Sequence, residues 1–122
     1  METLEQNAKN ELQSRLFNFT VNVIKLIRNL PVGVEYNVIS YQLIKAATST
    51  GANYEEAQGA VSKADFANKV GISLKEMRES NYWVRVIIAV TESNEEWKKI
   101  RQESHELMKI LGSIYSKTSV KR

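Results

Sequence analysis

Apolar residues recur every three or four positions along most of the chain, and they form four stripes of helical periodicity. The first stripe consists of Leu12, Leu16, Phe19, Val23, Leu26 and Leu30. The last stripe consists of Trp97, Ile100, Ser104, Leu107, Leu111 and Ile114. The second stripe becomes smaller and more polar toward its end, at Ala46, Thr50 and Asn53, which predicts a close approach of neighbouring backbones there. The pattern predicts helices over about residues 8–30, 35–57, 62–90 and 94–116.

Breaks in the pattern separate the four helices. Pro31 and Gly33 end the first helix, because a residue before proline avoids the helical conformation. Gly59 ends the second, and the motif Ser62-x-x-Asp65 supplies a side-chain cap for the third. A similar capping motif, Ser93-x-x-Glu96, precedes the fourth.

Short connections and the absence of strand-like alternation indicate an all-α protein. The favoured architecture is an antiparallel up-down-up-down four-helix bundle, with residues 1–122 as a single domain. The first alternative is an all-helical fold that is not a bundle. Several apolar residues lie outside the main stripes, namely Phe17, Val21, Ile24, Val86 and Ile87. Since large apolar patches are rare on soluble monomers, this surplus predicts self-association.

The composition is that of a soluble globular protein, with 43% hydrophobic and 25% charged residues. No apolar run approaches the roughly 20 residues that span a membrane, and the polar N-terminus does not resemble a secretory signal. We therefore expect a cytoplasmic protein with no membrane partner. The chain has no cysteine, which excludes thiolate metal sites and cysteine nucleophiles.

The net charge is +3, and the positive excess lies at the C-terminal end, where residues 107–122 contain four basic residues and no acid. A basic tail at 117–122 predicts attraction to nucleic acid or to an acidic protein. The candidate nucleic-acid-binding residues are Lys63, Lys69, Lys98, Lys99, Lys109, Lys117, Lys121 and Arg122.

A polar constellation falls on two of the predicted helices. Ser49, Asn53 and Glu56 share one face of the helix over 35–57, and Glu79 lies on the next helix. The favoured interpretation is a structural network in which the Asn53 amide satisfies carboxylate oxygens and fixes the helix register.

The competing interpretation of these carboxylates is a di-metal site. Such sites in helical bundles use Glu-x-x-His motifs, but the one histidine, His105, is preceded three positions earlier by Gln102. The sequence therefore predicts no metal and no cofactor. It also lacks a glycine-rich phosphate loop and a nucleophile with a partner histidine, so we expect no catalytic residue and no enzyme activity.

The stretch "LPVGVEYNVISYQLIKAATSTGANYEEAQGAVSKADFANKVGISLKEMRES" resembles the bacterial four-helix-bundle proteins that are encoded by intervening sequences in 23S ribosomal RNA genes, a ribosomal-protein-like family. The matching positions are Leu30, Pro31, Tyr36, Gln42, Leu43, Ala46, Ala47, Ser49, Ala52, Asn53, Glu56, Ser62, Asp65, Phe66 and Glu79. The chain departs from the pattern in having Ala57 where the family has glycine. It also has Lys63 as the cation nearest to a loop that usually carries arginine.

The resemblance implies a ring-shaped homo-oligomer, commonly a pentamer, with no catalytic residue. A relative of this fold serves as a basic accessory subunit of reverse transcriptases in diversity-generating retroelements. The favoured function is therefore a non-catalytic homo-oligomer that associates with RNA. The alternative is a protein-interaction scaffold or an accessory subunit for a nucleic-acid enzyme such as a reverse transcriptase. Helical spacing assigns Tyr82, Trp83 and Tyr115 to the core or an interface in preference to base stacking.

Overall fold

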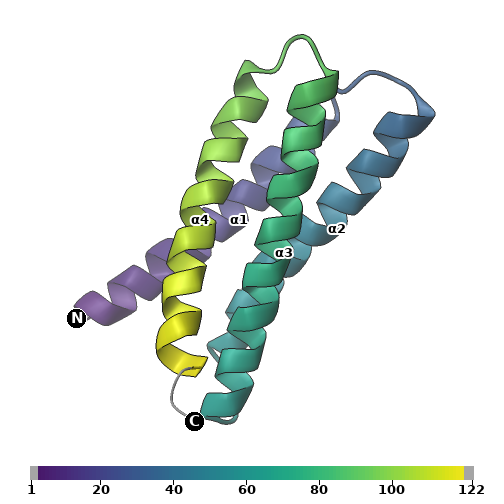
Figure 1. The fold of residues 1–122 in the computed structure, drawn as a ribbon. Helices are drawn as coiled ribbons and strands as arrows, with labels where there is room; N and C mark the ends of the chain where they lie inside the picture. The colour runs from purple at the N-terminus through teal and green to yellow at the C-terminus, as the bar shows by residue number, and fades with distance from the viewer. Residues whose placement is uncertain (1–2, 120–122) are drawn as a thin grey trace.

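The computed structural model describes residues 3–119, and it confirms the predicted all-α four-helix bundle, with no strand among these residues. The helices are α1 (Leu4–Ile27), α2 (Val34–Ala57), α3 (Lys63–Val90) and α4 (Glu95–Ser119). Helices α2, α3 and α4 lie alongside one another, while α1 runs obliquely behind α3 and α4 (Figure 1). Helix α1 packs against both α2 and α4, which closes the bundle. No described helix is both long and apolar enough to cross a membrane.

The helix ends follow local capping chemistry. Helix α1 begins before the predicted start at residue 8, because Thr3 and Gln6 form a capping box in which each side chain accepts a hydrogen bond from the other residue's backbone N–H. At α3, the Ser62 hydroxyl accepts the N–H of Asp65 at 3.0 Å, as predicted. The predicted capping box at Ser93 is wrong, because Asn94 directly precedes α4 and its carbonyl accepts the N–H of Lys98.

The core is built from the apolar stripes that the sequence pattern identifies. All four helices contribute fully buried side chains, among them Leu16, Phe19, Leu43, Met77, Leu107 and Leu111. Tyr54 is also 98% buried, and this burial raises the pKa of its hydroxyl. Burial of such large apolar side chains is the main stabilising contribution to a domain of this size.

Hydroxyl groups join the backbones of neighbouring helices inside this core. The Thr50 hydroxyl donates to the Ser73 carbonyl at 2.7 Å, and the Ser73 hydroxyl donates to the Thr50 carbonyl at 2.6 Å. Both residues are completely buried, so α2 and α3 approach closely at this point. The Thr20 hydroxyl likewise donates to the Ala47 carbonyl at 2.9 Å and joins α1 to α2. The predicted close approach near Thr50 is confirmed.

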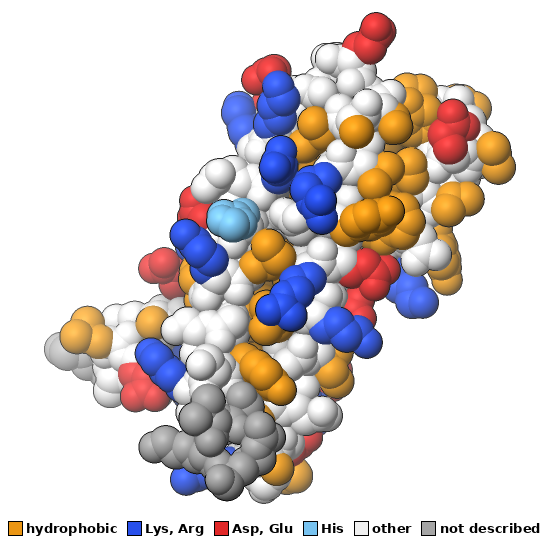
Figure 2. All heavy atoms as spheres, in the orientation of Figure 1, with side chains coloured by type: hydrophobic (Ala, Val, Ile, Leu, Met, Phe, Trp, Pro, Cys, Tyr) orange, Lys and Arg blue, Asp and Glu red, His pale blue; other side chains and the backbone are white. Residues whose placement is uncertain are grey.

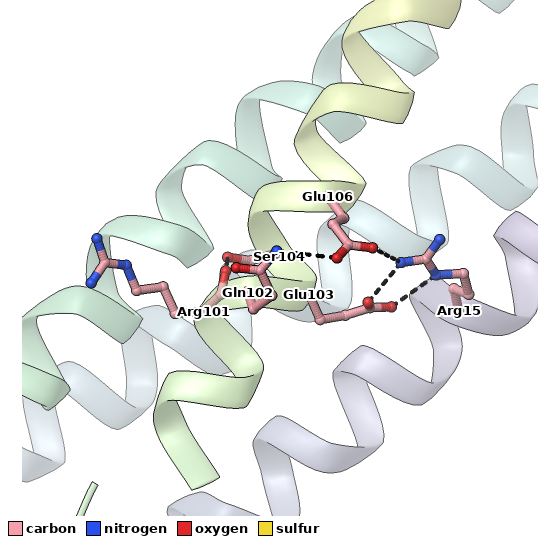
Figure 3. Close-up of polar contacts among 6 residues, drawn as sticks. All are labelled: Arg15, Arg101, Gln102, Glu103, Ser104 and Glu106. Carbon is pink, nitrogen blue, oxygen red and sulfur yellow. Dashed lines mark hydrogen bonds and ion pairs between the residues drawn. The ribbon is translucent and has the colours of Figure 1, made fainter. Parts of the chain in front are cut away.

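An ion-pair cluster joins α1 to α4 (Figure 3). Arg15 donates from Nε and Nη2 to the two carboxylate oxygens of Glu103, at 3.0 and 2.7 Å, and from Nη2 to Glu106 at 3.0 Å. Hydrogen bonds from Gln102 and then from Arg15 lower the pKa of Glu106. A carboxylate whose pKa is lowered by folding stabilises the protein above its unfolded pKa and loses that contribution as the pH falls, so this link weakens in acid.

Candidate nucleic-acid interface

Lysine and arginine side chains gather over the outer surfaces of α3 and α4, beside the only histidine (Figure 2). We call this surface the basic face, and it consists of Lys75, Arg78, Arg85, Lys98, Arg101, His105 and Lys109, all exposed. Within each helix these residues recur three, four or seven positions apart, so they share one side. That side points away from the buried residues Met77 and Leu107.

Two acidic residues of α4 lie on another side of that helix. Glu103 and Glu106 point toward α1, where Arg15 binds them. Figure 3 shows Arg101 extending from the opposite side of α4, away from this cluster. Among residues 3–119, Lys75, Arg78 and Arg101 take part in no ion pair, whereas Lys98 is paired with Glu95 at 3.4 Å. The positive charge at the centre of the basic face is therefore not neutralised by a neighbouring carboxylate.

Two contacts between α3 and α4 set the register of the two helices, and so determine which of their charged residues lie at the same level. The Asn81 amide donates to the Ser104 hydroxyl at 2.8 Å, and the Tyr115 ring packs so closely on Gly71 that a Cβ there would lie 2.8 Å from Tyr115 Cε1. Since the helices are antiparallel, this register puts Arg85 level with Arg101. It puts Arg78 level with residues 107–108, next to Lys109.

An aromatic residue lies within the basic face. The Tyr82 side chain is 50% exposed, and the guanidinium of Arg85 lies over its ring, 5.7 Å from the centroid. The Trp83 ring meets Tyr82 edge-on, with the centroids 5.0 Å apart. Arg85 also donates from Nε to the Asn81 side-chain oxygen at 2.9 Å, so its position is fixed on two sides.

The structure separates the lysines that the sequence selected. Lys98 and Lys109 belong to the basic face, but Lys69 is paired with Asp65 at 2.9 Å and Lys99 with Glu96 at 3.1 Å. Lys63 and Lys117 line a cavity of about 980 Å³ at the end of the bundle, together with Lys9. Lys121 and Arg122 lie outside the described residues. Lys69 and Lys99 are therefore each paired with a carboxylate of their own helix, and nucleic-acid binding by the selected cations stays a prediction.

Five residues of the basic face were missed by the sequence reasoning, namely Lys75, Arg78, Arg85, Arg101 and His105. A sum of charges along the chain hides them, because Glu76 and Glu79 offset their positive charge in the sequence, although neither acid is ion-paired with them among residues 3–119. The spacing of residues 75, 78 and 85 puts them on one side of a helix, and this pattern could have identified the basic face from the sequence.

The predicted carboxylate network is also corrected by the structure. The Asn53 amide donates to Ser49, at 2.9 Å to its carbonyl and 3.0 Å to its hydroxyl, and so stays within α2. Glu56 is exposed, and the exposed Glu79 carboxylate accepts a hydrogen bond from Trp83 Nε1 at 3.3 Å. Within residues 3–119, no three histidine or acidic side chains are close enough together to hold a metal ion.

Replacement of Glu79 by alanine is expected to change the free energy of unfolding by less than about 0.5 kcal/mol, since Glu79 is exposed and has one long hydrogen bond. Urea unfolding followed by circular dichroism measures this. Asn81→Ala is the matched comparison, because Asn81 is buried between α3 and α4, and we expect it to cost about 2 kcal/mol. An equal loss of unfolding free energy in both variants would show that Glu79 does have a structural role.

Comparison with known proteins supports both the fold and the resemblance. The family described as the 23S rRNA-intervening sequence protein matches residues 8–113. A crystal structure of a protein of unknown function from the S23 ribosomal protein family, from Bacteroides thetaiotaomicron, is 35% identical and superposes with a TM-score of 0.78. The alignment covers 88% of this chain and 97% of that protein. No match is found among curated proteins.

Proposed function

Because the chain belongs to the family of 23S rRNA-intervening sequence proteins, we propose that it is a non-catalytic protein that associates with RNA as a homo-oligomer. The observation that carries the proposal is the basic face. Six lysine and arginine side chains from two helices project from one surface, and the acids nearest in sequence lie on other sides or at its margin. Such a surface provides the sequence-independent attraction to phosphates that dominates nucleic-acid binding.

Each subunit offers a limited number of cations, so binding by one copy is weak at cellular salt, and joining several copies multiplies the phosphate contacts.

A second surface supports assembly of several copies. We call it the apolar face, and it consists of Val34, Val38, Tyr41, Trp83 and Val90, of which all but Trp83 are at least half exposed. Figure 2 shows hydrophobic side chains gathered over α2 and the adjoining end of α3. A hydrogen bond from the Tyr36 hydroxyl to the Val90 carbonyl, at 3.3 Å, holds these two helix ends together. Exposed apolar surface of this kind marks an interaction site.

The two faces lie on adjacent sides of α3, since consecutive residues of a helix are about 100° apart and the neighbours Tyr82 and Trp83 belong to the basic and the apolar face respectively. Assembly through the apolar face would therefore leave the basic face open to RNA. We propose an oligomer larger than a dimer, and the family resemblance favours five subunits. Each copy would then add its own basic face to the assembly.

Replacement of both Arg78 and Arg101 by glutamine is expected to weaken RNA binding about tenfold or more and to make it less dependent on salt, because fewer counterions are released. Fluorescence anisotropy with a labelled RNA at several salt concentrations measures both effects. The matched control replaces two exposed cations, Lys25 in α1 and Arg28 directly after it, by glutamine. Equal weakening by both pairs would show that only net charge matters and would overturn the assignment to the basic face.

Truncation after Ser116 tests the predicted tail separately, because it removes Lys117, Lys121 and Arg122 and leaves the basic face intact. If the intact protein binds no RNA at 50–150 mM salt, a range chosen to bracket cellular ionic strength, the RNA proposal fails. The alternative of a protein scaffold or polymerase accessory subunit would then be favoured.

A further inference from the structure

Tyr82 is a half-exposed aromatic ring in the middle of a cationic surface, and the core does not require it there. We propose that the basic face takes single-stranded RNA and that an unpaired base stacks on Tyr82 while Arg85 contacts the adjacent phosphate. The proposal rests on the proposed function and adds the class of RNA and the residue that selects it. The 50% exposure of Tyr82 contradicts its sequence-based assignment to the core, while the interface alternative stays a prediction.

The pair is held in place before any ligand arrives. Ser104 accepts a hydrogen bond from Asn81 at 2.8 Å, and Asn81 in turn accepts one from Arg85 at 2.9 Å. Asn81 is only 9% exposed, so this chain of hydrogen bonds runs from the α3–α4 contact to the surface. Arg85 also lies over the Tyr82 ring. Because the two side chains are already ordered, less conformational entropy is lost when RNA binds.

The exposed ring distinguishes single strands from duplexes. In a duplex the base faces are stacked on one another, so a protein ring reaches them only if a base is unstacked. A single strand presents free base faces, and stacking on an aromatic side chain is tolerant of sequence. Lys75, Arg78 and Arg101 would contact phosphates in either form, so the preference for single strands depends on Tyr82.

The test compares Tyr82→Leu, which keeps an apolar side chain without a flat ring, with Tyr82→Phe, which keeps the ring. Binding of a labelled 12-nucleotide single-stranded RNA and of a duplex of the same length is measured by anisotropy. We expect Tyr82→Leu to weaken single-strand binding roughly fivefold or more, with duplex binding and the salt dependence unchanged. Tyr82→Phe should bind like the intact protein. Thermal unfolding confirms that each variant is folded.

The outcomes separate this proposal from the proposed function. If the intact protein binds RNA and the Arg78 and Arg101 variant weakens it, but Tyr82→Leu binds normally, then the stacking proposal is wrong and the basic face stands. Equal weakening for single strands and duplexes would also overturn stacking. If the intact protein binds neither RNA, both proposals fail.

Discussion

Replacement of Ser73 by leucine is expected to lower the free energy of unfolding by about 3 kcal/mol, because the side chain sits where α2 and α3 are closest. Its hydroxyl is 2.6 Å from the Thr50 carbonyl and the residue is completely buried. A leucine adds three carbon atoms in this space and removes a hydrogen bond. The helices must then separate or the side chain must take a strained rotamer, and chemical denaturation monitored by circular dichroism measures the cost.

Ser73→Ala is the control, since it removes the same hydroxyl without adding volume. We expect it to cost about 1 kcal/mol, the usual contribution of one hydrogen bond. The difference between the two variants therefore reports the closeness of the helices. If leucine costs no more than alanine, α2 and α3 have room at this point and the close approach is not required for stability.

The fold was predictable because it depends on the spacing of large apolar residues. Leu16, Phe19 and Leu107 are buried as their periodicity requires, whatever the details of the neighbouring helix. Helix ends were less predictable, since they depend on single hydrogen bonds such as the one between Thr3 and Gln6.

The polar links were only partly predictable, because successive residues of a helix point about 100° apart. Ser49, Asn53 and Glu56 share a face, but spacing alone does not say which neighbour that face meets. The residue of α2 whose side chain bonds to α3 is Thr50, one position after Ser49. The basic face was unpredictable for the same reason. Arg85 lies level with Arg101 only because the hydrogen bond between Asn81 and Ser104 sets the register of α3 against α4.

Replacement of both Val38 and Tyr41 by glutamate is expected to dissociate the proposed oligomer into 13.9 kDa monomers. These side chains are 53% and 65% exposed in one copy, so the changes should leave the monomer folded. In an assembled interface, two buried carboxylates without partners would cost several kcal/mol, which raises the dissociation constant by about a hundredfold or more. Light scattering coupled to gel filtration measures the mass of each form.

The matched control replaces Val32 and Val61 by glutamate, because both valines are at least 92% exposed and lie in the loops that precede α2 and α3. This pair changes the net charge by the same amount outside the apolar face, so it should leave the mass of the assembly unchanged. Dissociation of both variants would point to general charge repulsion. A monomeric intact protein at micromolar concentration would remove the oligomer from the proposed function. RNA binding would then depend on the cations of one basic face, and its salt dependence would be correspondingly shallow.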